Sequence, residues 1–525
     1  MQIEEPGFSP IEGLRVIRLD VHSDNRGWFK ENWQRTKMVA AGLPDFGPVQ
    51  QNVSFNAERG VTRGLHAEPW DKLVSVAAGK VYGAWCDLRE GSATYGETFG
   101  IEIDPSVAVF VPRGVANGFQ ALTDATCYTY LVNDHWSADS EYAAVNLNMI
   151  DWPLEPTEIS EKDAAHPRLD IGGAGSAVAG AGSAGDGAGS ARPAMSPRKI
   201  LVTGANGQLG RALRKAYGAA THVEFCGREE FDIAMDEGEL FAARPWRQYS
   251  TIINCAAYND VNGAETDRAN AWAVNAAAPA RLAAVASEFN LTLVHVSSDY
   301  IFDGLSGTGE VVAGGTATAG AEARTGAEAG TGTEAEAKTS AEAGANKVRA
   351  HTEDELPSPL SLYGASKAAG DTAAQATRKH FVIRTAWVFG DGNNFMSTMR
   401  DLAKRGVKPA VVHDQRGRPT FAEDLAGAIK HLLESDREVA PYGVYNVTSE
   451  GDAVGRDEIA MAVFVGVGMD PSDVTPVSTQ QYAEINGGDA ARRPAESTLD
   501  LAKIKATGFT PRNWRAALAL YLALY

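Results

Sequence analysis

The chain has 525 residues, of which 44% are hydrophobic and 22% are charged. Since a single hydrophobic core stops growing near roughly 250 to 300 residues, this length predicts two or three domains of ordinary globular composition. The formal net charge of -19 argues against a broad basic surface that follows phosphate backbones, so no nucleic-acid partner is expected.

Cysteine usage and hydropathy narrow the class further. The four cysteines, Cys86, Cys127, Cys226 and Cys255, form no C-x-x-C pair, which predicts neither a disulfide framework nor a zinc site. The sequence contains no run of about 18 apolar residues, and its first residues lack the charged and apolar regions of a signal peptide. We therefore expect a cytoplasmic protein with no membrane partner.

Two low-complexity segments divide the chain. Residues 171–194 are mostly Gly, Ala and Ser, which is the composition of a flexible linker. Residues 304–350 are rich in Ala, Gly, Thr and Glu and have too few apolar side chains to offset the entropy of ordering. We predict a first domain over residues 1–170, a linker over 171–197, and a second domain over 198–525 with a disordered insertion. A helix in the EAEAKTSAEA part of that insertion is the alternative.

The first domain is predicted to be all-β. Its runs KVYGAWCDL, SVAVFVP and CYTYLV are rich in β-branched and aromatic residues and are bounded by Gly, Pro and Asp. This pattern is typical of short antiparallel strands that form a sandwich or a small barrel.

Seven motifs in the same region resemble those of the dTDP-4-dehydrorhamnose 3,5-epimerases, which are cupin-type β-barrels. In chain order they are DNRGWFKE, VQQNVSF, GVTRGLH, DKLVSVAAGKVYGAWCDLREGS, VPRGVANGF, IDWPL and SEKD. The resemblance implies epimerisation at C3 and C5 beside a C4 ketone of a nucleotide-linked sugar. That chemistry requires a base to remove an acidified C–H proton and an acid to return a proton from the opposite face.

Three residues are the catalytic candidates of this domain. The resemblance implies that His66 in RGLH is the base, that Asp163 in SEKD orients it, and that Tyr130 in CYTYLV is the acid. A neutral imidazole, whose pKa lies near the working pH, is suited to remove the proton. Tyr128, two residues before Tyr130, is expected to point to the opposite side of the strand.

Further residues match positions that bind the substrate in the family, where guanidinium and ammonium groups suit contacts to a diphosphate. The matching residues are Arg26, Glu31, Gln50, Asn52, Arg63 and Lys72. The chain departs from the family pattern at AEPW after RGLH, at Asn117 where a histidine is usual, and in a shortened stretch before IDWPL. These departures leave open whether both carbons are epimerised. Since cupin epimerases are typically dimers, we expect a homodimer through this domain.

The second domain is predicted to be α/β. KILVTG, THVEFCG, TIINCAA and LTLVHVSS are its predicted strands, and QLGRALRKAYG and a long alanine-rich segment are helices between them. Strands that alternate with helices form a parallel, doubly wound sheet. EIAMAVFVGVGM and WRAALALYLALY are predicted to be amphipathic helices of a smaller lobe.

A glycine-rich turn follows the first of these strands. Gly204, Gly207 and Gly210 are spaced G-x-x-G-x-x-G. Such a turn lets the backbone approach a pyrophosphate at the N-terminus of the next helix.

Tyr363 and Lys367 form a Y-x-x-x-K pair in SLYGASKAAGD. This spacing places both side chains on one helical face, one turn apart. The ammonium is expected to lower the pKa of the phenol, which then protonates the alkoxide that forms when hydride reaches a carbonyl. Ser298 in VSSDY is placed to share that hydrogen bond.

Residues from about 198 to 525 resemble the dTDP-4-dehydrorhamnose reductases of the extended short-chain dehydrogenase/reductase family. The motifs are NCAAYNDVNGAE, VSSDYIFDG, SLYGASKAAGD, RTAWVFG, NNFMSTM, DQRGRPT and RRPAESTLD. The resemblance implies a Rossmann fold, hydride transfer to the C4 ketone, catalysis by Ser298, Tyr363 and Lys367, and substrate contact by Arg493. The implied cofactor positions are Gly204, Asn206, Gly207, Gln208, Leu209, Gly210, Asp232, Ile233, Ala256, Ala257, Tyr258, Asn275, Tyr363 and Lys367.

NADPH is the predicted cofactor, with NADH as the alternative. The second predicted strand ends in FCGREE without the acidic residue that usually holds a ribose 2′-hydroxyl, and Arg228 is placed for a 2′-phosphate. Some relatives bind magnesium through a glutamate after the glycine turn. Arg211 and Ala212 stand in that region here, so no metal is predicted.

The two domains together predict a bifunctional enzyme that epimerises dTDP-4-dehydro-6-deoxyglucose and then reduces it to dTDP-L-rhamnose. Their fusion raises the local concentration of the second active site. Two alternatives stay open. In one, the chain is a reductase whose first domain is a binding or dimerisation module. In the other, the same chemistry acts on another nucleotide-linked deoxysugar, such as a UDP-linked one.

Overall fold

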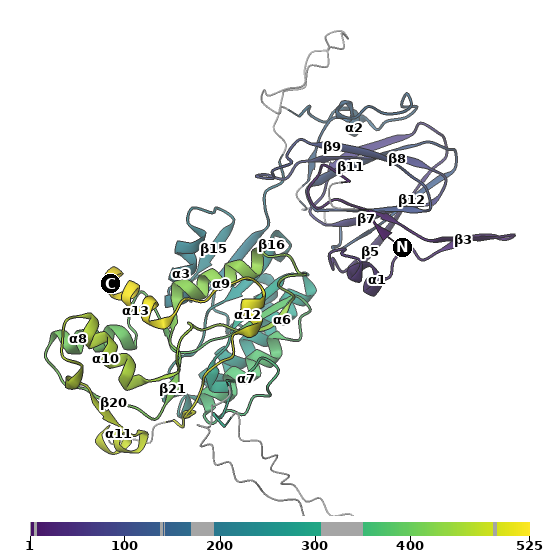
Figure 1. Cartoon of the computed structure of the whole chain (residues 1–525). Helices are drawn as coiled ribbons and strands as arrows, with labels where there is room; N and C mark the ends of the chain where they lie inside the picture. Colours follow the sequence, from purple (N-terminus) through teal and green to yellow (C-terminus); the bar gives the residue numbers. More distant parts are fainter. Residues whose placement is uncertain are drawn as a thin grey trace, which may run out of the picture. The chain divides into compact units, whose positions relative to one another are not determined.

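The computed structural model describes residues 2–4, 8–136, 140, 142–169, 194–305, 350–486 and 491–525. The chain divides into two compact units, Met1–Lys199 and Ile200–Tyr525 (Figure 1). The predicted linker, apart from its last residues, and almost all of the predicted insertion lie outside the described residues. Within the described part, no helix is long and apolar enough to cross a membrane.

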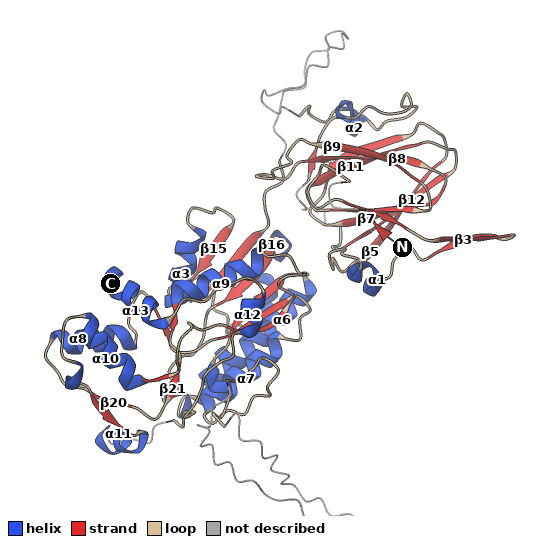
Figure 2. Cartoon of the chain, in the orientation of Figure 1, coloured by secondary structure: helices blue, strands red, loops and turns tan. Residues whose placement is uncertain are grey.

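The first unit is built from two antiparallel sheets (Figure 2). In the described residues one sheet has the order β1 (Gln2–Ile3), β2 (Arg15–Arg18), β10 (Val107–Val111), β7 (Lys72–Ala78), β12 (Thr126–Val132) and β5 (Gln50–Asn56). The other has the order β13 (Ala143–Ala144), β6 (Thr62–Ala67), β11 (Val115–Ala121), β8 (Val81–Asp87) and β9 (Thr98–Ile103). Strands of both sheets contribute to one apolar core that includes Val74, Trp85 and Phe119. The prediction of an antiparallel all-β domain is confirmed.

A hairpin of β3 (Val21–Asp24) and β4 (Gly27–Lys30) extends away from these sheets (Figure 1). The unit also contains α1 (Arg35–Ala40), the 3-10 turn Leu147–Met149 and the short helix α2 (Glu161–Ala164). Ser160 caps α2 by accepting a hydrogen bond from the Asp163 N–H, which fixes the direction of that helix.

The second unit contains a six-stranded sheet in the described residues. Its order is β15 (Val223–Cys226), β14 (Lys199–Thr203), β16 (Tyr249–Asn254), β17 (Thr292–Val296), β18 (His380–Arg384) and β23 (Gly443–Asn446). The pairs β14–β15, β16–β17, β17–β18 and β18–β23 run parallel. The predicted alternation of strands and helices is therefore confirmed.

Helices cover both faces of this sheet. On one face lie α3 (Gln208–Tyr217), α9 (Ala422–Glu434) and α12 (Ala502–Ala506), and on the other α4 (Glu237–Ala242), α6 (Ala278–Glu288) and α7 (Leu362–Ala374). Ile253 faces the first set and Ile252 the second, because neighbouring side chains in a strand point to opposite faces. The long alanine-rich helix is interrupted: α5 (Arg268–Trp272) and α6 are joined by a π-helical turn, Ala273–Ala277.

A smaller lobe has its own apolar core. It contains the helices α8 (Phe395–Lys404), α10 (Arg456–Gly466), α11 (Thr479–Asn486) and α13 (Trp514–Leu524). Its strand pairs are β19 (Val388–Phe389) with β22 (Thr420–Phe421), β20 (Ala410–Val412) with β25 (Thr475–Val477), and β21 (Arg416–Gly417) with β24 (Val454–Gly455). The two predicted C-terminal helices are α10 and α13.

Candidate active sites

The first unit holds a cavity of about 470 Å³ between strands β6, β7, β11 and β12 and helix α2. Its lining includes the predicted residues Arg63, His66, Lys72, Tyr130 and Asp163. The fold thus brings together one imidazole, one phenol, one carboxylate and two cationic groups that lie far apart in the sequence.

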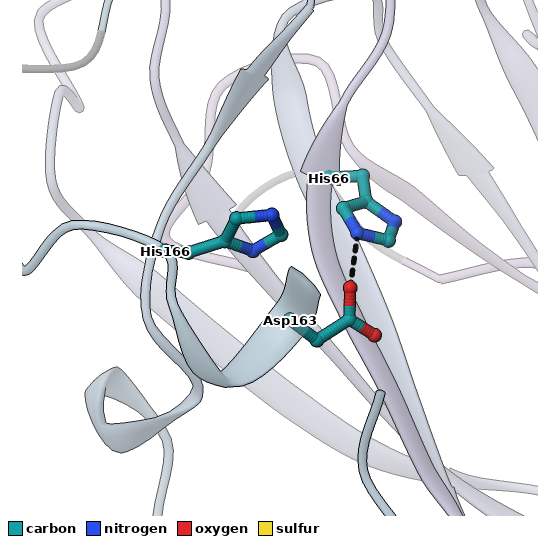
Figure 3. Close-up of side chains that lie close together, drawn as sticks. All are labelled: His66, Asp163 and His166. Atoms are coloured by element: carbon teal, nitrogen blue, oxygen red, sulfur yellow. Dashed lines mark hydrogen bonds and ion pairs between the residues drawn. The ribbon is translucent and has the colours of Figure 1, made fainter. Parts of the chain in front are cut away.

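His66 and Asp163 form a hydrogen-bonded pair in this cavity (Figure 3). The His66 Nε2 lies 2.8 Å from Asp163 Oδ1, and the Gly64 N–H donates to the other carboxylate oxygen at 3.2 Å. Burial lowers the pKa of His66, while the charge of Asp163 opposes that shift. The imidazole is therefore neutral at pH 7, and the carboxylate holds it in a fixed orientation.

His166 lies edge-on to His66, with ring centroids 5.2 Å apart (Figure 3). Among the described side chains, His66, Asp163 and His166 each place one metal-ligating atom within 4.8 Å of the others. The three residues consist of the hydrogen-bonded His66–Asp163 pair and a second imidazole beside it, in a cavity that Tyr130 also lines. We interpret the group as an acid–base site.

Lys72 is a buried cation in this cavity, and its partner was not predicted. Its ammonium pairs with Glu68 and lies 5.2 Å from the centroid of the Tyr130 ring. Burial lowers the pKa of Lys72 to about 7, whereas the Glu68 carboxylate favours the charged form. Glu68 stands in AEPW, where the chain departs from the family pattern, but its pairing with Lys72 becomes recognisable only in the fold.

Tyr130 and Tyr128 both line the cavity, so the expectation that Tyr128 points to the opposite side of the strand is wrong. Side chains two residues apart in a strand share a face, and the two ring centroids lie 6.1 Å apart. The Tyr128 hydroxyl donates to Asn117 Oδ1 at 3.2 Å. Burial raises the pKa of Tyr130, so its phenol stays protonated and can donate a proton.

The other predicted binding residues of this unit divide into two groups. Gln50 and Asn52 lie on β5, on the same face as the cavity-lining Ser54, and Asn52 is the register partner of Tyr130. Arg26 and Glu31 do not line the cavity. Arg26 lies at the tip of the β3–β4 hairpin and bonds Asp24, and Glu31 follows β4 and bonds Lys37.

In the second unit, the glycine turn connects β14 to α3. Gly207 is the N-cap of α3, so Asn206 precedes the helix and Gln208, Leu209 and Gly210 form its first turn. A Cβ on Gly210 would lie 2.5 Å from the Ala205 Cα. Only glycine lets the helix start this close to the strand, which leaves backbone N–H groups free for a pyrophosphate.

Replacement of Gly204 by Ala is expected to destabilise the second unit more than the same change at Gly406, which follows α8. Both glycines have positive φ, +66° and +68°, which costs an L-residue about 1–2 kcal/mol. A Cβ at Gly204 would also lie 2.6 Å from the Ala256 N, whereas Gly406 faces open space. The expected result is a larger fall in melting temperature for Gly204→Ala than for the control variant. NADPH affinity should weaken only in Gly204→Ala. Equal shifts in both variants would contradict the steric argument.

Tyr363 and Lys367 lie on α7, and Ser298 is the second residue after β17. Burial raises the pKa of Tyr363, and a hydrogen bond with Ser298 opposes that shift. The expectation that Lys367 lowers the pKa of the phenol is wrong for this structure, because the ammonium donates to the Val296 carbonyl at 2.6 Å. The raised pKa keeps the phenol protonated, as a proton donor requires.

The reductase step is expected to lose rate as the pH rises above about 8. Burial lowers the pKa of Lys367 to about 8, so its ammonium is present below that pH and is lost above it. The check is a pH profile of NADPH oxidation with the epimerised ketone as substrate. Lys367→Arg keeps the positive charge, so its rate should not fall above pH 8, even if the rate is lower overall. An unchanged fall above pH 8 in this variant would assign the titration to another group.

Asp299 is a second residue that the sequence did not predict, although it stands in the SSDY motif. It is 2% exposed, and the Ser298 hydroxyl donates to its Oδ1 at 3.1 Å. Burial raises the pKa of Asp299 to about 6. This carboxyl fixes the Ser298 hydroxyl beside Tyr363.

The remaining predicted cofactor residues follow the carboxyl ends of the strands. Asp232 and Ile233 come after β15, and Ala256, Ala257 and Tyr258 come after β16. In open parallel sheets, ligands bind outside these strand ends. Asp232 accepts from the Ala234 N–H and pairs with the exposed Arg228.

Asn275 in the π-helical turn connects two of these segments. Its Oδ1 accepts from the Tyr258 N–H at 2.9 Å, and its Nδ2 donates to the Ser366 hydroxyl at 3.1 Å. The interruption of the helix thus places an amide between the loop after β16 and α7, as π-turns at functional sites often do. Arg493 is the predicted substrate contact of this unit. Its guanidinium donates to Asn262 Oδ1 at 3.0 Å and to the Ala491 carbonyl.

Comparisons with known proteins agree with this geometry. A family model described as dTDP-4-dehydrorhamnose 3,5-epimerase matches residues 9–170, and one described as RmlD substrate binding domain matches residues 198–314 and 341–525. A Streptococcus pyogenes protein described as RmlC homolog is 52% identical over 171 residues, which are 30% of this chain and 86% of that protein. The dTDP-4-dehydrorhamnose reductase of Mycobacterium tuberculosis is 34% identical over 333 residues, 62% of this chain and 92% of that protein.

A solved structure gives the same result for the second unit. The dTDP-4-dehydrorhamnose reductase of Bacillus anthracis, in complex with NADP, is 27% identical with a TM-score of 0.50 and covers 62% of this chain and 99% of its own. Both predicted family resemblances are therefore confirmed. The chain belongs to the dTDP-4-dehydrorhamnose 3,5-epimerase family through its first unit and to the dTDP-4-dehydrorhamnose reductase family through its second, and it is a bifunctional isomerase and NAD(P)-dependent oxidoreductase.

Proposed function

We propose that the chain performs two consecutive steps on one nucleotide-linked sugar, dTDP-4-dehydro-6-deoxyglucose. The first unit inverts C3 and C5, and the second reduces the C4 ketone to give dTDP-L-rhamnose. The observation that carries this proposal is that one polypeptide holds both a His–Asp pair facing a tyrosine and a Tyr–Lys pair beside a glycine turn.

In the first step, the C4 ketone acidifies the neighbouring C–H bonds, and neutral His66 removes one of these protons. The electron pair of the broken C–H bond moves toward the C4 oxygen, where the buried Lys72 ammonium supplies a positive charge. Tyr130 then returns a proton to carbon from the opposite face. Asp163 holds the imidazole in place and stabilises its protonated form.

In the second step, bound NADPH supplies a hydride to C4. Tyr363 gives its phenolic proton to the oxygen that becomes a hydroxyl, and Ser298 orients that phenol. We assign Lys367 to positioning the cofactor ribose and the backbone at Val296. The raised pKa of Tyr363 ensures that the proton is present at the start of each turnover.

The fold supports the same assignment at a finer level. Two facing antiparallel sheets around a ligand cavity fit a cupin-type barrel. A parallel sheet with helices on both faces and a glycine turn after β14 fits a Rossmann domain, with Arg228 near the end of β15 available to a 2′-phosphate. Arg493 is assigned to the sugar nucleotide.

A homodimer through the first unit explains two features of its surface. β5 is an edge strand of its sheet, and its outer face exposes Val53 and Phe55 by 64% and 63%. The hairpin that carries the predicted binding residue Arg26 extends away from the two sheets of its own unit (Figure 1), and Arg26 does not line the cavity of that unit. A second copy that covers β5 would bury the apolar strand face and could receive this hairpin beside its cavity.

Phe55→Glu is therefore expected to weaken the dimer and to lower epimerase activity. A charge on the outer face of β5 opposes burial against a second copy. Sedimentation velocity measures the dimer fraction, and Val439→Glu, an exposed apolar residue of the second unit, is the matched control. A dimer that survives Phe55→Glu unchanged would exclude this surface.

The proposed function is tested by incubating the purified chain with dTDP-4-dehydro-6-deoxyglucose and NADPH. Absorbance follows the cofactor, and NMR identifies the sugar. Formation of dTDP-L-rhamnose is the expected result. A product that keeps the D configuration would support a reductase with a non-catalytic first unit. Faster turnover of the UDP-linked ketone would support the alternative nucleotide.

A further inference from the structure

Residues 194–199 are described as part of the first unit, although the epimerase family match ends at residue 170. The Met195 N–H donates to the Leu88 carbonyl at 2.8 Å, and the Met195 carbonyl accepts from the Glu90 N–H at 3.0 Å. Arg89 is its bridge partner. Met195 thus hydrogen-bonds through both its N–H and its carbonyl to the residues on either side of Arg89, as paired strands do. The segment pairs with the chain that follows β8 in the first unit.

The Met195 side chain completes an apolar cluster on that edge. It is 3% exposed and belongs to the cluster that contains Leu65 and Ala67, both fully buried. These two residues flank His66 in β6. Because successive side chains of a strand point to opposite faces, Leu65 and Ala67 face away from the cavity that His66 lines. Met195 is thus part of the packing behind the strand that carries the base.

Arg198 stands in the same segment and lies within electrostatic range of a residue that precedes β7. Burial lowers the pKa of Arg198 to about 10, and the negative charge of the Asp71 carboxylate acts against that shift. Asp71 is itself fixed, since it accepts from the Arg113 N–H at 2.8 Å and from Asn133 Nδ2 at 2.9 Å. It directly precedes Lys72, the buried cation of the cavity, at the start of β7. The segment therefore packs behind β6 through Met195, and Arg198 lies within electrostatic range of the residue that precedes Lys72.

We propose that residues 194–198 are the last structural element of the epimerase and act as a positioning element for His66. The inference rests on the proposed role of His66. It also means that the reductase follows with almost no spacer, because its first strand, β14, begins at Lys199, and that an epimerase ending at residue 170 lacks part of its structure.

The test uses the full chain with Met195→Asp, which places a carboxylate in the apolar cluster. The expected result is a fall of about tenfold or more in the kcat of epimerisation with little change in KM, because small displacements of a catalytic group cost rate. Deuterium incorporation at C3 and C5 measures this kcat. NADPH oxidation with the already epimerised ketone should stay at the parent rate. Ser196→Asp introduces the same charge at the adjacent exposed position and should change neither activity. Met195→Leu should restore the parent kcat.

Equal behaviour of Met195→Asp and Ser196→Asp would overturn the proposal, as would an equal loss of both activities. If Met195→Asp abolishes the melting transition of the first unit, Met195→Ala replaces it, and an unchanged kcat in Met195→Ala would then be the contrary result. Failure of the proposed function gives a different result from failure of this inference. If His66 is not the base, His66→Ala leaves epimerisation intact, while Met195→Asp still melts at a lower temperature than Ser196→Asp.

Discussion

His66→Ala is expected to lower the rate of epimerisation by about 10²- to 10⁴-fold, because a positioned base contributes that much to proton transfer. The structure gives the reason for the size of the effect. His66 is the imidazole that lines the cavity, its orientation is fixed by Asp163 at 2.8 Å, and burial keeps it neutral. Deuterium incorporation into the sugar from D₂O measures the step directly.

The same protein contains its own control for this variant. When the epimerised ketone is supplied, His66→Ala should oxidise NADPH at the parent rate, since the reductase residues belong to the other unit. His166→Gln changes the neighbouring ring while sparing the pair with Asp163, and it should keep most of the activity. Full epimerisation by His66→Ala would favour the alternative in which the first unit is a binding or dimerisation module.

The parts of the site that the sequence predicted are of two physical kinds. The Tyr363–Lys367 pair and the glycine turn are local, because helix and turn geometry fix which side chains meet within a few residues. The His66–Asp163 pair joins residues 97 positions apart. No periodicity predicts such a contact, and the family motifs supplied it.

The features that sequence reasoning missed depend on tertiary packing. Glu68 is recognisable as a partner only when Lys72 is seen to be buried beside it. The sequence predicted a lowered pKa for Tyr363, and the structure raises it. Burial of the phenol is the largest effect, and the Lys367 ammonium donates to the Val296 carbonyl instead. The orientation of Tyr128 required only the two-residue period of a strand, so that error was avoidable.

Tyr363→Phe is expected to lower the rate of reduction by about 10²- to 10⁴-fold, because the phenolic proton is the one delivered to the new hydroxyl. Epimerisation should continue, so the 3,5-epimerised ketone accumulates while NADPH is retained. Tyr217→Phe removes a phenol on α3, outside the Tyr363, Lys367 and Ser298 group, and is the matched control. Undiminished NADPH oxidation by Tyr363→Phe would assign the proton donor to another group.

The two variants together test whether each unit is a complete catalyst. His66→Ala lacks the first step and Tyr363→Phe lacks the second, so a mixture of the two proteins should form dTDP-L-rhamnose after a lag in which the free ketone accumulates. The protein that carries both changes should form none. If the mixture also forms none while each single variant keeps its remaining activity, the intermediate does not exchange between molecules. In that case the fusion does more than raise the local concentration of the second site.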